Sequence, residues 1–152
     1  MIEIGKSETA DTRTCDVTKV SKETLEASSV QHIHDVYMGM RFFANKLEES
    51  ARMHDWDKLT EIDHFHSDFK TGFAETGWWD NHLKVNRHHL NSDDGVRDDV
   101  NLVDVIDYIV DCIMAGMARS GSVYDLEISD EVLRKAFHNT VELLKANVTV
   151  SK

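Results

Sequence analysis

Histidine and aspartate are the residues of this chain whose number and spacing most suggest chemistry. The sequence has nine histidines. Eight of them fall within residues 32–89: His32, His34, His54, His64, His66, His82, His88 and His89. Three aspartates, Asp104, Asp107 and Asp111, follow at helical spacing. Because imidazole and carboxylate together suit borderline divalent metals such as Mn, Fe, Co, Ni and Zn, the pattern indicates a metal site.

Some of these residues are also explained without a metal. Three histidines are expected at the surface or in structural positions: His64, His66 and His138. We expect His34 to be an ordinary half-exposed helix residue. The three aspartates share one face of a predicted helix, opposite its apolar residues, so a solvated acidic face accounts for them equally well. From periodicity alone, both interpretations stay open for the aspartates.

Helices must carry these side chains, because apolar residues recur at helical spacing along most of the chain. Helices are predicted from Ser28 or Ser29 to Arg52, from Thr60 onward, over 78–86, over 101–119 and after Ser129. The sequence contains no proline, which favours long uninterrupted helices, and it shows no convincing strand pattern. We therefore expect one compact all-α domain of about five helices over residues 21–152, preceded by an N-terminal arm over residues 1–20.

The charge balance argues against two kinds of partner. The sequence has 17 lysines and arginines against 28 aspartates and glutamates, a formal net charge of −11. An extended nucleic-acid groove needs clustered positive charge, as does docking on an anionic membrane, so neither is expected. The start of the chain lacks the features of a signal peptide, and no apolar run approaches the ~20 residues that span a bilayer. Two cysteines, Cys15 and Cys112, make no disulfide framework, and the sequence predicts a cytoplasmic protein.

The order of the histidines and aspartates resembles the HD-domain superfamily, an all-α fold of metal-dependent phosphohydrolases, over residues 28–119. Four stretches carry the resemblance: the first-helix motif at 32–36 (HIHDV), the name-giving doublet His54-Asp55 with Lys58 behind it, His82 with 86–89 (NRHH), and the helix of the last aspartate ligand at 102–111. The doublet is followed by Trp-Asp-Lys rather than the Gly-Lys common in cyclic-dinucleotide hydrolases. A chain without proline also has no Gly-Tyr-Pro motif, so activity on cyclic dinucleotides is not expected.

The resemblance implies a ligand set for one or two divalent ions, drawn from Mn, Fe, Co, Ni, Mg or Zn. One ion would be held by His32, His54, Asp55 and Asp111, and a second by His82 with His88 or His89, with Asp55 bridging the two. The choice between His32 and His34, and between Asp107 and Asp111, stays open. A water activated by the metal would attack phosphorus, with Asp55 and Lys58 as the catalytic residues. The residues expected to bind the substrate are Lys58, Arg87 and His89, and Asp107 would orient a ligand.

These expectations lead to one main hypothesis and two alternatives. The main hypothesis is a metal-dependent phosphohydrolase that acts on a nucleotide or another small phosphate compound. The alternatives are a mixed-valent di-iron oxygenase, which shares the fold, and a non-catalytic metal-binding module. The tryptophans beside the motifs, Trp56, Trp78 and Trp79, would either stack on a base or pack structurally. Proteins of this superfamily are often oligomers, and the apolar last helix could serve as the interface of a homo-oligomer.

Overall fold

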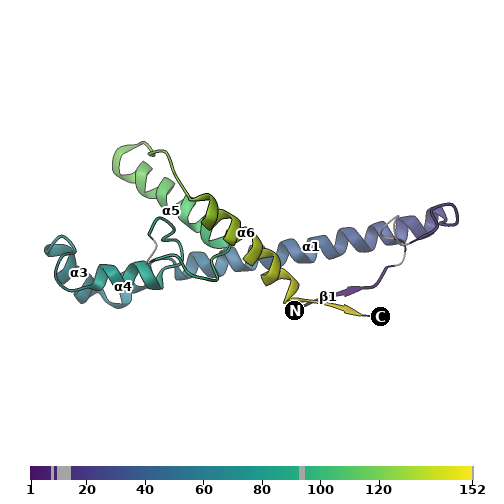
Figure 1. Ribbon diagram of the computed structural model, residues 1–152, viewed down its shortest axis with the longest axis horizontal. Coiled ribbons are helices and arrows are strands. Elements are labelled where there is room, and N and C mark those ends of the chain that lie inside the picture. The colour runs from purple at the N-terminus through teal and green to yellow at the C-terminus, as the bar shows by residue number, and fades with distance from the viewer. Residues whose placement is uncertain (8, 10–14, 93–94, 152) are drawn as a thin grey trace. The chain divides into compact units, whose positions relative to one another are not determined.

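Helices make up most of the structure, a computed structural model that describes residues 1–7, 9, 15–92 and 95–151 (Figure 1). The elements in chain order are β1 (Ile2–Gly5), α1 (Lys22–Met53), α2 (Trp56–Thr60), α3 (Ile62–Lys70), α4 (Trp78–Val85), α5 (Leu102–Ser120), α6 (Asp130–Lys145) and β2 (Val148–Ser151). The predicted all-α class is confirmed. Across the described ranges, however, α2 is an additional helix, in a segment that the sequence predicts as a break.

By its contacts, the chain divides into two units. One consists of Met1–Asn45 with Glu142–Lys152, and the other of Lys46–Val141. The predicted boundary after residue 20 lies inside the first unit, so the units do not follow it. No helix in the described part of the chain combines the length and apolar character needed to cross a membrane.

The first unit contains two short strands that the sequence pattern did not predict. β1 pairs with β2 in parallel, from Ile2 opposite Val148 to Gly5 opposite Ser151, and Figure 1 shows them near the two ends of the chain. Both strands alternate apolar and polar residues, as strands do, but each has only four residues. Such a short alternation is too weak to stand out in a helical sequence.

The helix α1 begins earlier than predicted. The backbone N–H of Thr24 donates to Oγ of Ser21 over 3.2 Å, so Ser21 caps the helix. The proposed cap Ser29 lies inside the helix, where its hydroxyl donates to the carbonyl of Leu25 over 2.8 Å. The prediction of a start at Ser28 or Ser29 was therefore wrong. The first turns of α1 are polar and good helix formers, and without apolar periodicity they leave no signal.

The second unit is built around the apolar faces of α5 and α6. Its core consists of Leu90, Val100, Val105, Tyr108 and Ala136. The predicted start of α5 is confirmed, since the side chain of Asn101 accepts from the backbone N–H of Val103 over 2.9 Å. The predicted cap of α6 is also confirmed, since Oγ of Ser129 accepts from the backbone N–H of Val132 over 3.2 Å. The cap at Asn101 fixes the start of α5, which carries the three aspartates.

A buried aspartate fixes the start of α4, which carries His82. The carboxylate of Asp68, fully buried, accepts from the backbone N–H groups of Thr76 and Trp79, each over 3.0 Å. The N-cap of α4 is Gly77, which has no side chain to satisfy these N–H groups, so Asp68 does so from α3.

Candidate metal centre

The turn between α1 and α2 places Asp55 in the middle of the candidate site. Asp55 directly precedes α2 and has φ 52° and ψ 27°, in the left-handed region. Few residues other than glycine adopt this conformation, although aspartate does so more readily than most. The backbone N–H of Asp55 donates to Oδ1 of Asn86 over 3.1 Å. The turn is thus held by the residue that caps the end of α4.

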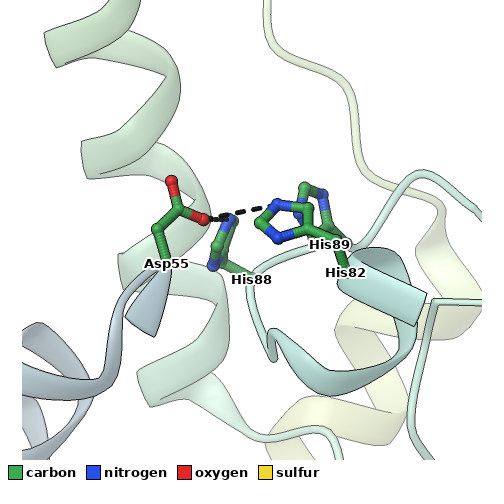
Figure 2. A group of neighbouring side chains, drawn as sticks. All are labelled: Asp55, His82, His88 and His89. Atoms are coloured by element: carbon green, nitrogen blue, oxygen red, sulfur yellow. Dashed lines mark ion pairs between the residues drawn. The ribbon is translucent and has the colours of Figure 1, made fainter. Parts of the chain in front are cut away.

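Three histidines surround one oxygen of Asp55. Oδ1 of Asp55 lies 3.4 Å from Nε2 of His82 and 3.5 Å from Nε2 of His88. His89 completes the group, in which one potential ligand atom from each residue lies within 4.8 Å of the others. Figure 2 shows the Asp55 carboxylate pointing toward the imidazole rings. His82 comes from α4, and the other two histidines come from the segment that follows it.

The atoms of this group are suited to a divalent ion. Oδ1 of Asp55 and Nε2 of all three histidines are buried and have no hydrogen-bond partner within the described ranges. Leaving four polar atoms unsatisfied is unfavourable, and buried polar groups are normally paired. Two atoms that each lie about 2.1 Å from a tetrahedral ion are about 3.4 Å apart, which is close to the separations found here. The donor set of three imidazoles and one carboxylate therefore fits a borderline divalent metal.

The other oxygen of Asp55 faces a second set of residues. Nε2 of His54 lies 3.5 Å from Oδ2 of Asp55 and 3.6 Å from Oδ1 of Asp111. Nδ1 of His54 lies 2.8 Å from Oδ1 of Asp107, and the hydroxyl of Ser50 donates to Oδ2 of Asp107 over 2.8 Å. His54, His88 and Asp107 form a second group that could hold a metal ion. Hydrogen bonds occupy both oxygens of Asp107, so its contacts are those of a residue that orients His54. The carboxylate of Asp111 is therefore the more available of the two for binding an ion.

Burial keeps the loop histidines in the neutral form. Burial, and after it the neighbouring His54, lowers the pKa of His88. Burial, together with His88 and His82, lowers the pKa of His89 to about 4. A metal binds the neutral imidazole, because its lone pair must be available. Both side chains therefore have the protonation state of a ligand at neutral pH.

Lys58 contacts the same carboxylate from the side of the solvent. Its ammonium pairs with Oδ2 of Asp55, and the lysine side chain is 34% exposed. Burial by itself would raise the pKa of Asp55, but the hydrogen bond and charge of Lys58, with His54 and His82, hold it below its ordinary value. Asp55 is therefore ionised at neutral pH, as a metal ligand must be.

Two supporting residues, Asp57 and Asn86, were missed by the sequence analysis. Asp57 is fully buried, and its Oδ2 lies 2.9 Å from Nδ1 of His82. Nδ2 of Asn86 donates to Oδ1 of Asp57 over 2.8 Å. The only sequence signals are that Asp57 lies two residues after the His54-Asp55 doublet and Asn86 one helical turn after His82. Neither spacing reveals that the two side chains meet.

His32 belongs to the other unit of the chain, so its predicted role as a ligand stays a prediction. His32 and its alternative His34 are both exposed on the part of α1 that belongs to the first unit, whereas both groups lie in the second. The segment of α1 that contacts the candidate site is its end, through Ser50. Periodicity predicts a long helix but does not tell which of its turns lies beside the other ligands.

Arg87, which the sequence analysis expects to bind the substrate, is paired with two aspartates in this structure. Its Nε and Nη2 donate to the two oxygens of Asp104 over 2.7 and 2.8 Å, and its Nη1 donates to Asp99 over 3.0 Å. Burial opposes its charge, but the two aspartates outweigh burial and raise the pKa of Arg87. Asp104 is only 2% exposed, so the expectation of a solvated acidic face fails for it. Arg87 thus ties the start of the segment that follows α4 to the first turn of α5.

The tryptophans divide between packing and exposure. Trp78 is fully buried, and its ring stacks on that of His82 with centroids 4.8 Å apart. Trp79 stacks on His82 as well, at 5.1 Å. Both rings thus support a candidate ligand rather than offer a surface for a base. Trp56 is 37% exposed beside Asp55.

No family model, no curated protein and no solved structure matches this chain. Inference about its function rests on the residues themselves and on their geometry.

Proposed function

We propose that this protein is a metal-dependent phosphohydrolase that cleaves a phosphate ester of a nucleotide or of a similarly small phosphate compound. One observation carries the proposal. The two oxygens of Asp55 face different histidines, with His82 and His88 at Oδ1 and His54 at Oδ2, and Lys58 stands next to them. This is the arrangement expected of a carboxylate that bridges two ions, and the resemblance to the HD-domain superfamily supports it.

In this proposal, Oδ1 of Asp55 with His82, His88 and His89 holds one ion. Oδ2 of Asp55 with His54 and Asp111 holds a second. The abundance of imidazole favours Mn, Fe, Co, Ni or Zn over Mg. Divalent ions bound at such a site supply a nucleophilic water near neutral pH and neutralise the charge that develops on the phosphate oxygens.

The chain's own residues would orient and bind the substrate. Hydrolysis forms a bond from a water oxygen to phosphorus and breaks the ester P–O bond, and the leaving oxygen takes a proton to become an alcohol. An ammonium has three hydrogens to donate, so Lys58 can contact Asp55 and still donate to a phosphate oxygen. Asp107 and Ser50 hold His54 with its Nε2 toward Asp55 and Asp111.

The test is elemental analysis of the purified protein followed by a phosphate-release assay. The assay would use a panel of nucleotides and other phosphate monoesters with added Mn²⁺, Co²⁺ or Zn²⁺. We expect release from at least one compound, and Asp55→Ala should lose both the metal and the activity. His66→Ala is the matched control, because His66 is exposed on α3 and belongs to neither group.

The proposal fails if protein loaded with each metal releases no phosphate from any compound in the panel. A tightly held pair of irons with an electron paramagnetic signal would favour the di-iron oxygenase instead. Lys58 speaks for phosphate chemistry, since an ammonium beside the bridging carboxylate suits an anionic substrate.

A further inference from the structure

His82 is held, on the side away from Asp55, by two buried polar residues. His82 and Asp57 are fully buried, and Asn86 is only 2% exposed. Nδ1 of His82 lies 2.9 Å from Oδ2 and 3.1 Å from Oδ1 of Asp57, and Nδ2 of Asn86 donates to Oδ1 of Asp57 over 2.8 Å. Neither Asp57 nor Asn86 has a part in the proposed reaction. A carboxylate buried this deeply is unfavourable unless its partners are well placed, so its presence calls for a reason.

These contacts determine which nitrogen of His82 carries the proton. Nδ2 of Asn86 also lies 2.9 Å from Nδ1 of His82, but its two hydrogens have acceptors in Oδ1 of Asp57 and in the backbone carbonyl of His82. A carboxylate only accepts hydrogen bonds, so Nδ1 of His82 is the donor to Oδ2 of Asp57. In a neutral imidazole, the other nitrogen then has the lone pair. That nitrogen, Nε2, faces Oδ1 of Asp55 at 3.4 Å and has no hydrogen-bond partner within the described residues. The buried carboxylate therefore selects the tautomer in which His82 can bind an ion.

Asn86 connects this histidine to the turn that carries Asp55. Its Oδ1 accepts from the backbone N–H of Asp55, whose φ is 52°, while its Nδ2 donates to Asp57. A backbone N–H only donates and a carboxylate only accepts, so the two partners fix the orientation of the amide. The buried amide of Asn86 thus holds both the backbone of Asp55 and the carboxylate of Asp57, which in turn contacts His82.

We propose that Asp57 and Asn86 are positioning residues of the metal centre: Asp57 sets the tautomer of His82, and Asn86 couples that setting to the left-handed turn at Asp55. This inference rests on the metal centre of the proposed function but not on phosphate hydrolysis. A purely structural role would affect stability alone. A positioning role affects metal affinity beyond what the loss of stability explains.

The decisive variant is Asp57→Asn. The amide oxygen of the new side chain is drawn to Nδ2 of Asn86, and its NH₂ group then faces Nδ1 of His82. His82 must accept at Nδ1, and its proton moves to Nε2, the atom that would bind the ion. We expect the affinity for Zn²⁺, measured by competition with a chelator, to fall about 10- to 100-fold. Asn86→Ala should lower it as well, because both links are lost.

Asp68→Asn is the matched control. Asp68 is another fully buried carboxylate of the same unit, but it accepts from the backbone N–H groups of Thr76 and Trp79 and contacts no candidate ligand. Because Asp68 holds the start of α4, which carries His82, this variant shows how much affinity for Zn²⁺ is lost when α4 is loosened without a change at His82 itself. We expect it to melt at a lower temperature and to lose clearly less affinity for Zn²⁺ than Asp57→Asn does. If Asp57→Asn loses no more affinity than Asp68→Asn, the positioning role is wrong.

A second measurement decides the matter even if Asp57→Asn does not fold. The ¹⁵N shifts of His82 in the unaltered, metal-free protein report which nitrogen carries the proton of the neutral ring, and we expect that nitrogen to be Nδ1. A dominant Nε2–H form would overturn the inference. Protein that binds Zn²⁺ but hydrolyses no phosphate would reject the proposed reaction and leave the positioning role intact. Protein that binds no Zn²⁺ would reject the metal centre, and the positioning role with it.

Discussion

The two sides of Asp55 are built in the same way but differ in their access to solvent. On each side, a carboxylate contacts Nδ1 of a histidine whose Nε2 faces Asp55: Asp57 contacts His82, and Asp107 contacts His54. The side chains of Asp57 and His82 are fully buried, whereas that of His54 is 27% exposed. Lys58, with its ammonium on Oδ2 of Asp55, belongs to the exposed side.

This difference suggests that the two sides of the candidate metal centre have different roles. A ligand set that is buried and held in one tautomer loses little freedom when it binds an ion, so it should hold that ion tightly. The exposed side leaves room for water and for a phosphate, and it carries the ammonium that an anion would contact. Under the proposed function, one ion is therefore resident, and the substrate reaches the centre from the side of His54 and Lys58.

The largest expected effect comes from replacing the histidine on each side in turn. His82→Gln should weaken the tightest binding of Zn²⁺ by more than about 100-fold, since loss of a ligand exceeds the loss of a ligand's partner. His54→Gln should weaken this tightest binding by no more than about 10-fold, because His54 lies at the other oxygen of Asp55, in the set that would hold the second ion, and water can take the position of an exposed ligand there. Titration of the metal-free variants with Zn²⁺, against a chelator, measures both.

Glutamine keeps the length and the polarity of the side chain, which makes the two variants a matched pair. Circular dichroism melts must show that each is folded at the temperature of the titration. Equal losses of affinity in the two variants would remove the distinction between a buried and an exposed side.

Most members of the two candidate metal-binding groups could be chosen from the sequence, whereas the residues that support them could not. His54, Asp55, His82, His88 and His89 could be chosen because their types, order and spacing are unusual. Asp57 could not, because an aspartate in a charged segment is ordinarily a surface residue, and its burial depends on a contact with His82, 25 residues away. Arg87 shows the same limit in reverse, since its partner Asp104 lies 17 residues away on another element. Contacts between distant segments decide whether a charge binds a substrate or stabilises the fold.

Arg87→Ala tests whether this arginine belongs to the site or to the fold. This substitution leaves the buried carboxylate of Asp104 without its bidentate partner, so the free energy of unfolding should fall by about 2 kcal/mol. The figure is below that of a fully buried pair, because the arginine side chain is 32% exposed. Denaturant unfolding measures the change. Arg97→Ala, which removes an exposed arginine that pairs with the exposed Asp99, is the control and should change stability little.

The same variant tests whether Arg87 contacts the substrate. Under the proposed function, if Arg87 has only a structural role, the KM for a phosphate compound found in the assay should stay within about twofold at a temperature where the variant is folded. A tenfold increase in KM, without loss of stability, would indicate that Arg87 binds the substrate.

Asp107→Asn should affect metal binding less than Asp57→Asn does. The new side chain can keep one hydrogen bond, to His54 or to Ser50, and water can supply the other, because this side is partly exposed. We expect the affinity for Zn²⁺ to fall by about 10-fold or less, at the lower end of the range for residues that orient ligands. Chelator competition on both variants at one pH makes the comparison. A larger loss for Asp107→Asn would contradict the ranking of the two sides.

The smallest effect concerns the pH dependence of stability, which Asp68 should show through its role at the start of α4. Burial opposes its charge, but backbone N–H groups of Trp79 and Thr76 hold the pKa of Asp68 below its ordinary value. Because the pKa of Asp68 is lower in the folded than in the unfolded protein, its contribution to stability is fully present above the unfolded value of about 3.9 and is lost as the pH falls through the folded value.

The melting temperature of Asp68→Asn should therefore lie below that of the original protein at pH 7, and the gap between the two melting temperatures should narrow at pH 3. Asp125→Asn, at an exposed position before α6, should show no gap at either pH. A gap of constant size for Asp68→Asn would mean that Asp68 acts through packing rather than through its charge.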